Sequence, residues 1–165
     1  MGFSLDHVIF FGRTWDECLS MYALEESDLA GQRILDCPGG PDALVAEGIG
    51  RGLDIHAVDP QYAHEPDVLE ARGRDEIIDS MRKWQEDPAQ AWDQKQADEF
   101  TRLKLDALGS FITAYRSHRD RFIDASLPDL PFEDEAFDLV LSGHLLFLYA
   151  SIEDGGLMSH DRLDL

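Results

Sequence analysis

Two adjacent glycines followed at a distance by an acid form the most informative pattern in the sequence. Gly39 and Gly40 come directly after a short apolar run, and Asp59 ends the next apolar run. Glycines lack the Cβ atom that would keep a ligand away from the backbone. A helix that starts after them offers free N–H groups to a carboxylate or phosphate. An acid at the end of the next strand can accept hydrogen bonds from both hydroxyls of a ribose. The pattern therefore predicts a ligand that contains a nucleoside.

The same loop indicates which nucleoside ligands fit poorly. The phosphate-loop pattern GxxxxGK[ST] and the dinucleotide pattern GxGxxG are both absent from it. Asp42, at the expected start of the following helix, would repel a pyrophosphate. A nucleoside without phosphates fits better, and S-adenosylmethionine is such a ligand.

The elements that would position this loop belong to an α/β fold. Four short apolar runs bounded by turn residues predict buried strands at 33–37, 53–58, 121–124 and 137–142. A helix is expected over 41–51, with Pro41 in its first turn. The run at 137–142 is continuous enough to be buried on both faces. Parallel strands joined by helices bring their carboxyl ends to one edge, where ligands bind in open α/β sheets. We therefore predict an α/β fold with a mostly parallel sheet.

Two helical regions accompany the strands in a single domain of 165 residues. Residues 1–30 are expected to form an N-terminal helical cap, in which Thr14 and Glu17 have the spacing of a capping box. Residues 66–119 are expected to form a helical insertion of two or three helices, with breaks near Gly73 and Asp87-Pro88. Aromatic residues recur along this insertion, and we expect them in the core.

The net charge of −20, from 34 acids and 14 bases, limits the partners of the chain. Such a surface repels phosphate backbones and anionic membranes, so we expect neither nucleic-acid nor membrane binding. The acidity is typical either of an ordinary solvated surface or of adaptation to high salt, where screening relieves self-repulsion. The two cysteines, Cys18 and Cys37, form no disulfide framework, and the sequence shows no signal peptide or membrane helix. These features predict a cytoplasmic protein.

Segments along most of the chain resemble class I S-adenosylmethionine-dependent methyltransferases. ILDCPGGPDALVAEGIGRGLDIHAVDP, at 34–60, is similar to motif I of that family and its following acidic position. LPFEDEAFDLVLS, at 130–142, is similar to the segment before and along the fourth strand. GRTWDECLSMYAL, from Gly12, resembles the cofactor-covering helix of some bacterial members. The resemblance runs from about Gly12 to Tyr149, with a longer helical insertion than usual at 66–119. It implies a Rossmann-like three-layer sandwich with a mostly parallel sheet.

The resemblance implies S-adenosylmethionine as the cofactor and places residues of this chain around it. The methionine end and the ribose would contact Asp36, Cys37, Gly39, Gly40 and Asp59. The adenine would lie beside Pro60, Gln61, Ser126 and Leu127. The residues beneath or over the cofactor would be Ser142, Gly143, Arg13 and Tyr22.

The expected reaction is transfer of the sulfonium methyl group to an unidentified small-molecule substrate. Because the cofactor supplies the reactivity, the protein mainly has to align the nucleophile and exclude water. His144 would face the substrate and is the nearest candidate for a general base. The histidines show no metal-ligand spacing, so we expect no metal.

Departures from the family pattern leave alternatives open. Pro41-Asp42 fills the place of the usual third glycine, and Ser126 stands where the family often has an acid. The family fold continues through three more strands, so the implied order 3-2-1-4 is truncated and leaves strand four as an open edge that a homodimer could cover. One alternative is a cofactor-binding but inactive or truncated subunit that acts through interaction. Another, disfavoured by the GGPD loop, is a nicotinamide-dependent reductase.

Overall fold

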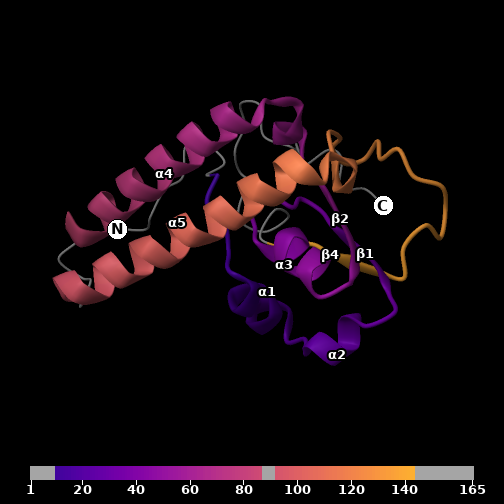
Figure 1. Cartoon of the computed structure of the whole chain (residues 1–165), viewed down its shortest axis with the longest axis horizontal. Coiled ribbons are helices and arrows are strands. Elements are labelled where there is room, and N and C mark those ends of the chain that lie inside the picture. The colour runs from indigo at the N-terminus through magenta and orange to yellow at the C-terminus, as the bar shows by residue number, and fades with distance from the viewer. Residues whose placement is uncertain (1–9, 87–91, 144–165) are drawn as a thin grey trace.

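A single parallel sheet forms the centre of the protein, whose computed structural model describes residues 10–86 and 92–143. Its strands are β1 (Arg33–Asp36), β2 (Asp54–Val58), β3 (Phe122–Ile123) and β4 (Leu139–Leu141). They pair in the order β3-β2-β1-β4, and every pair is parallel (Figure 1). The predicted α/β class and strand order are therefore confirmed.

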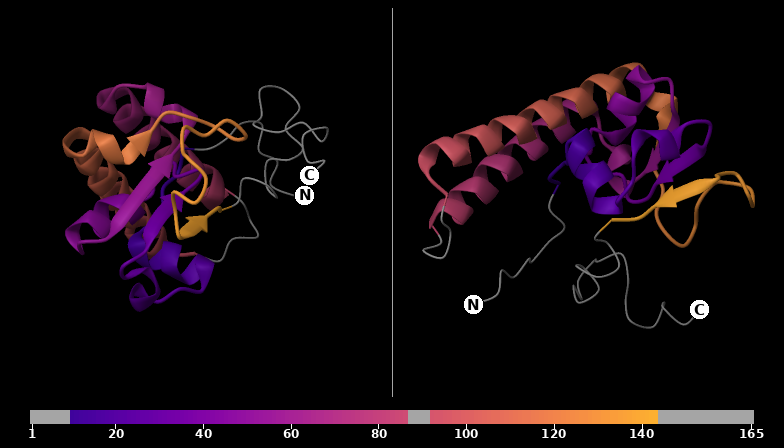
Figure 2. Two further views of the ribbon diagram at one scale, coloured as in Figure 1. Left: turned by 90° about the vertical axis from the view of Figure 1, so that its right-hand side faces the viewer. Right: turned by 90° about the horizontal axis from the view of Figure 1, so that it is seen from below.

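Helices connect β1 to β2 and β2 to β3 and pack on the sheet. They are α1 (Trp15–Tyr22), α2 (Glu26–Leu29), α3 (Leu44–Gly50), α4 (Pro66–Glu86) and α5 (Gln94–Ser117), with short 3₁₀ turns η1 (Pro60–Ala63) and η2 (Arg119–Arg121). The long helices α4 and α5 lie side by side as a hairpin that extends well past the sheet (Figures 1 and 2). This hairpin is the predicted insertion between β2 and β3.

The predicted capping box at the start of α1 is confirmed. The Thr14 N–H donates to Glu17 Oε2 at 2.8 Å, and the Glu17 N–H donates to Thr14 Oγ1 at 3.3 Å. The described part of the N-terminal cap consists of two short helices, because Ala23 adopts a left-handed conformation at φ 52° and ends α1. Residues 1–9 lie outside the described ranges.

Two predicted helix boundaries are wrong, each for a local reason. The helix expected from Pro41 begins only at Leu44, because the residues between them remain part of the loop. The break expected near Gly73 is absent, since α4 runs through this position. The break expected at Asp87-Pro88 lies outside the described residues. A Cβ atom on Gly73 would lie 2.7 Å from Leu108 Cδ1. The missing side chain therefore lets α4 approach α5 closely instead of interrupting the helix.

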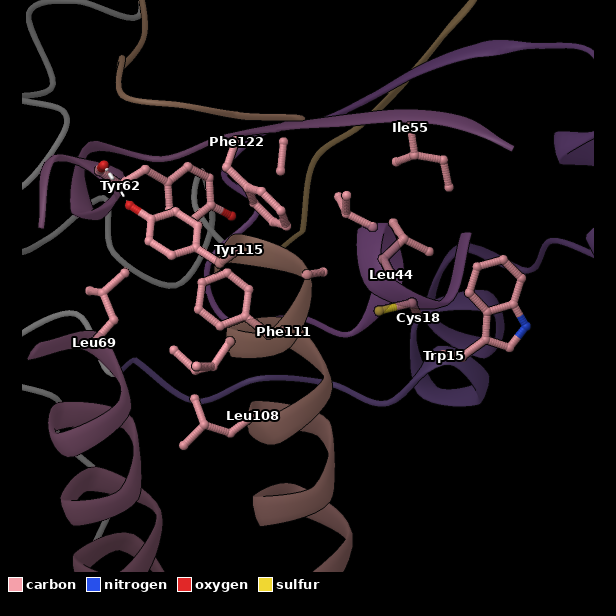
Figure 3. Close-up of a cluster of buried hydrophobic side chains, with 14 of the residues drawn as sticks. Trp15, Cys18, Leu44, Ile55, Tyr62, Leu69, Leu108, Phe111, Tyr115 and Phe122 are labelled. Atoms are coloured by element: carbon pink, nitrogen blue, oxygen red, sulfur yellow. Dashed lines mark hydrogen bonds between the residues drawn. The ribbon is translucent and has the colours of Figure 1, made fainter. Parts of the chain in front are cut away.

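All the described helices that contribute to the core pack against one side of the sheet, here called the helix-covered face. Its sheet residues are Ile34, Ile55, Ala57, Phe122 and Leu141. Phe111 and Tyr115 of α5 lie at the centre of this core, where Tyr115 donates a hydrogen bond to the Tyr62 carbonyl oxygen at 2.7 Å (Figure 3). The core role expected for the aromatic residues is confirmed for these two. It fails for Trp84 and Trp92, which are exposed and whose tilted rings have centroids 5.4 Å apart.

The opposite side of the sheet, here called the loop-covered face, is formed by Leu35, Val58 and Ile123. In the described residues it is covered by the segment 124–138 and not by a second layer of helices (Figure 2). Side chains of this segment such as Phe132 and Phe137 pack on the face. No residue of β4 belongs to the cluster on this face, and Val140 of β4 is 59% exposed. The expectation that 137–142 is buried on both faces is therefore wrong at Val140.

Candidate functional site

The loop between β1 and α3, residues 37–43, is called the glycine loop below. Gly39 donates its N–H to the Val58 carbonyl oxygen at 2.9 Å, so the loop lies against the end of β2. A Cβ atom on Gly39 would lie 2.6 Å from Ala57 Cβ and 2.7 Å from the Tyr62 hydroxyl. Only glycine fits this approach, and the first glycine of the pattern therefore serves the packing of the loop on the sheet.

The second glycine has open space where a side chain would be. Gly40 adopts a left-handed conformation at φ 51°, and among the described residues no atom of a neighbouring element lies within 4 Å of an ideal Cβ position. Its backbone is held on both sides: the N–H donates to Asp59 Oδ2 at 3.0 Å, and the carbonyl accepts from the Tyr62 hydroxyl at 2.7 Å. Gly40 is thus a fixed backbone position that a ligand can approach.

Asp59 connects the end of β2 to the glycine loop. Its Oδ1 atom accepts from the Gln61 N–H at 2.8 Å, and Oδ2 accepts from Gly40. Burial raises the pKa of Asp59, while these two N–H groups act in the opposite direction. Each carboxylate oxygen retains capacity for a second donor, such as a ribose hydroxyl. The residue predicted to bind ribose therefore also orders the loop beside it.

Asp42 is paired inside the protein. It accepts from the Arg13 backbone N–H at 2.6 Å and from Arg13 Nη1 at 3.1 Å, and the Ala43 N–H donates to the Arg13 carbonyl oxygen at 2.9 Å. Arg13, predicted to lie over the cofactor, contacts this acid of the glycine loop. Because the Arg13 guanidinium balances the charge of Asp42, Asp42 alone does not exclude a pyrophosphate from the loop.

Asp36 ends β1 beneath the glycine loop and is only 2% exposed. Burial is the largest cause that raises the pKa of Asp36 well above its usual range; Asp42 and Asp59 raise it further, and Arg13 opposes them. Ionising such a carboxyl group is costly until a donor or a cation is beside it.

Tyr22 and Gly143 lie at the same end of the sheet. The Tyr22 hydroxyl is 2.8 Å from the position that a Cβ atom on Gly143 would take, so glycine after β4 leaves room for the phenol. Burial, followed by the charge of Asp36, raises the pKa of Tyr22. The structure therefore brings Tyr22, Asp36 and Gly143 together although they are far apart in the sequence.

The remaining predicted contacts follow the carboxyl ends of the other strands. Pro60 and Gln61 begin η1 after β2, and Arg72 of α4 donates to Gln61 Oε1. Ser126 and Leu127 follow β3, and Leu127 packs on the loop-covered face. Ser142 is exposed after β4.

Cys37 and His144 differ from the other predicted residues. Cys37 is buried in the loop-covered cluster, and burial raises the pKa of its thiol to about 11, which does not suit a nucleophile. His144, the predicted general base, lies outside the described ranges.

The N-terminal segment and the hairpin contribute residues that sequence reasoning missed. Lys104 is 3% exposed, and its Nζ donates to both oxygens of Glu17 at 2.7 and 2.6 Å. The same ammonium lies 5.1 Å from the ring of Phe11 and 5.0 Å from that of Phe100. The sequence could have predicted this burial, because Phe100, Lys104 and Leu108 are spaced four residues apart and so lie on the same face of α5.

A groove of about 870 Å³ lies elsewhere, between α3 and α5. None of the predicted site residues lines it. In the described ranges, no group of three or more His, Cys, Asp or Glu side chains is arranged for a metal ion. No helix within those ranges is long and apolar enough to span a membrane.

Comparison with known proteins relates the chain to an archaeal protein. No family model matches the sequence, and no solved structure matches it. The chain is 30% identical over 153 residues to the uncharacterized protein MJ0045 of Methanocaldococcus jannaschii, a match that covers 90% of this chain and 68% of that protein. The chain therefore belongs to the same family as the uncharacterized protein MJ0045.

Proposed function

We propose that the protein is an S-adenosylmethionine-dependent methyltransferase that acts on a small molecule. The observation that carries the proposal is the edge of the parallel sheet where Gly40, fixed in a left-handed conformation with open space beside it, is hydrogen-bonded to Asp59. The carboxyl ends of parallel strands form the ligand-binding edge of open α/β sheets. The motif resemblance of this loop and of segment 130–142 supports the choice of ligand.

The charges around the loop favour a cationic nucleoside. Three buried carboxyl groups, Asp36, Asp42 and Asp59, lie in or beside the glycine loop, and Arg13 is already paired with Asp42. This excess of acids disfavours a phosphate and suits a ligand with positive charge. S-adenosylmethionine has a sulfonium and an ammonium group, whereas a nicotinamide dinucleotide has a pyrophosphate. A nicotinamide-dependent reductase is accordingly less well supported.

When bound, the cofactor would supply a methyl group that is activated for in-line displacement. The chain's own residues would bind, orient and exclude water: Gly40 and Asp59 along the nucleoside, and Tyr22 and Asp36 at the other end. His144 stays the candidate for accepting a proton from the substrate nucleophile. Cytoplasmic location and the absence of nucleic-acid and membrane partners stay proposals that rest on the acidic composition and on two buried, free cysteines.

A second candidate function is a cofactor-binding but inactive subunit that acts through interaction. The exposure of Val140 favours it, together with the pairing of β4, which within the described residues bonds only to β1. A partner, such as a second copy of the chain, could pair with this edge.

Calorimetry with S-adenosylmethionine, its demethylated product S-adenosylhomocysteine, and NAD tests the proposal. We expect both adenosyl-sulfur ligands to bind and NAD not to bind. Asp59→Ala should weaken binding by at least about tenfold, because it removes a charge-assisted hydrogen-bond acceptor. Asp54→Ala, at the opposite end of β2, is the matched control and should leave binding unchanged. Failure of both adenosyl-sulfur ligands to bind the wild type would overturn the proposal.

Turnover separates the two candidate functions. If S-adenosylmethionine binds, incubation with a pool of metabolites and labelled methyl donor should transfer label to a small molecule. Binding without any transfer would favour the inactive subunit.

A further inference from the structure

The hairpin of α4 and α5 carries most of the exposed apolar side chains of the protein. Among the described residues, six large hydrophobic side chains are exposed, and all but Val140 belong to residues 66–117. The end of the hairpin where α4 stops and α5 starts extends past the sheet (Figures 1 and 2). Three of the exposed side chains belong to this end and are called the tip patch below: Trp84, Trp92 and Leu103, which are 40%, 39% and 42% exposed. Neighbouring exposed apolar side chains of this kind mark an interaction surface.

The tip patch continues into a cluster of rings that is anchored in the protein. The ring centroids of Trp84 and Trp92 are 5.4 Å apart, and those of Trp92 and Phe100 are 5.0 Å apart. Phe100 stacks in turn on Phe11, which packs against the core. Leu103 follows Phe100 by one helical turn, so the two side chains are neighbours on α5. The patch is therefore the exposed end of a fixed aromatic cluster.

The hairpin also differs in charge from the rest of the chain. Residues 66–117 contain 11 acids and 8 bases and so carry a net charge of −3, whereas the whole chain carries −20. Charges near the tip are paired within α4, since Arg82 lies 2.5 Å from Asp79 and 3.0 Å from Glu86. An acidic surface repels another acidic protein, and the hairpin is the region where this repulsion is weakest.

We propose that the tip patch is the interface of a homodimer, in which the tip patches of two copies pack against each other. A two-fold axis brings the same surface of both copies together, so an apolar patch meets an apolar patch. Because the hairpin extends past the sheet, this contact keeps the two acidic sheet regions apart (Figure 2). Burial of the indole rings supplies the driving force. The inference does not depend on the proposed cofactor, and its surface is distinct from the edge of β4.

The size of the hairpin suits such an interface. A stable interface takes roughly 800 Å² from each partner. The helices α4 and α5 have 21 and 24 residues and lie side by side, so each spans at least about 30 Å. The hairpin therefore offers a face on this scale around the tip patch.

The charge distribution predicts the direction of a salt dependence. Repulsion between two acidic copies is screened more strongly as the screening length falls from about 10 Å at about 0.1 M salt to about 3 Å at about 1 M. The apolar contact itself does not rely on charge. Dimerisation should therefore strengthen when salt is added, whereas attraction to a basic partner would weaken.

Sedimentation velocity over a range of protein concentrations, at about 0.1 M and about 1 M salt, tests the inference. We expect the wild type to form a dimer whose dissociation constant is lower at the higher salt concentration. Leu103→Glu places a charge in the patch without removing a buried side chain, and it should raise the dissociation constant at least about tenfold. Val140→Glu places the same charge on the exposed residue of β4 and is the matched control, which should dimerise as wild type does. Circular dichroism checks that both variants keep their helix content.

Tryptophan fluorescence of the wild type gives a second test that needs no variant. Trp15 is only 7% exposed, so a change in access of a soluble quencher such as acrylamide reports on Trp84 and Trp92. Shielding from acrylamide should increase with protein concentration, in step with the fraction of dimer.

Four results would overturn the inference. The first is a wild type that stays monomeric at both salt concentrations. The second is loss of the dimer in Val140→Glu but not in Leu103→Glu, which would assign the interface to the edge of β4. The third is a monomer whose tryptophans are shielded at every concentration, which would show that the same chain covers the patch. The fourth is a monomer whose tryptophans become shielded only when poly-lysine is added, which would show that the patch binds a basic partner.

Discussion

The two faces of the sheet are covered to very different degrees. The helix-covered face packs against the aromatic core of α5, where Phe111 and Tyr115 are fully buried. The loop-covered face packs against segment 124–138 and leaves Val140 59% exposed. The glycine loop is held mainly from the first face, through Gly39 against Ala57 and Tyr62. We infer that the helix-covered face fixes the geometry of the site, while the other face contributes less to stability.

The largest expected effect comes from a substitution in the helix-covered face. Phe111→Ala should lower the free energy of unfolding by about 3–5 kcal/mol, because it leaves a large cavity in a core without exposed atoms. Phe132→Ala on the loop-covered face should cost only about 1–2 kcal/mol, since that ring is partly exposed and its site can relax. Urea denaturation of both variants measures the difference. Equal losses would show that the two faces contribute equally.

A smaller effect is expected at the glycine loop itself. Gly39→Ala should cost about 1–3 kcal/mol, because its methyl group would overlap Ala57 and Tyr62. Gly40→Ala should cost about 1 kcal/mol. Its methyl group would meet no described neighbour, so the cost comes only from holding alanine in the left-handed backbone conformation. Urea denaturation orders the two variants. A larger loss in Gly40→Ala would contradict the packing assigned to Gly39.

The smallest effect concerns the junction of β1 with the segment that precedes β4. Arg33 donates to Asp138 Oδ1 at 2.8 Å, and this contact lowers the pKa of Asp138 to about 2. A carboxyl group whose pKa is lower in the folded than in the unfolded protein stabilises the fold at any pH above its unfolded-state pKa. That stabilisation is lost as the pH falls toward about 2. Asp138→Asn should therefore reduce the loss of stability across this acidic range.

Urea midpoints measured against pH, as the difference between wild type and variant, isolate this contribution. Asp124→Asn, an exposed acid on the same connecting segment, is the control and should follow wild type. A variant curve at Asp138 with the same slope as wild type would show that the ion pair adds nothing.

The sheet could be predicted from the sequence because each strand is a short apolar run between turn residues. The runs that became β1 and β2 also placed Gly40 and Asp59 at neighbouring strand ends, where they are hydrogen-bonded. This part of the site depends on local pattern and on the geometry of parallel strands. It required no knowledge of which distant side chains meet.

The parts that sequence reasoning missed depend on such distant contacts. Asp42 was expected to act on a ligand, yet it pairs with Arg13, 29 residues away. Gly73 resembled a helix break, but Leu108 of the neighbouring helix explains it. The burial of Lys104 was not predicted, and it pairs with Glu17, 87 residues away. Each contact joins segments that are far apart in the sequence, and a single sequence does not specify which of these segments pack together.

The most direct test of a cofactor site at the glycine loop is the backbone amide spectrum of the protein during titration with S-adenosylmethionine. We predict that the amide signals of Gly39, Gly40 and Gln61 shift progressively to saturation, while those of Gly50 and Gly109 beside the α3–α5 groove stay unchanged. Shifts confined to the groove, or no shifts at all at millimolar ligand, would contradict the proposed site.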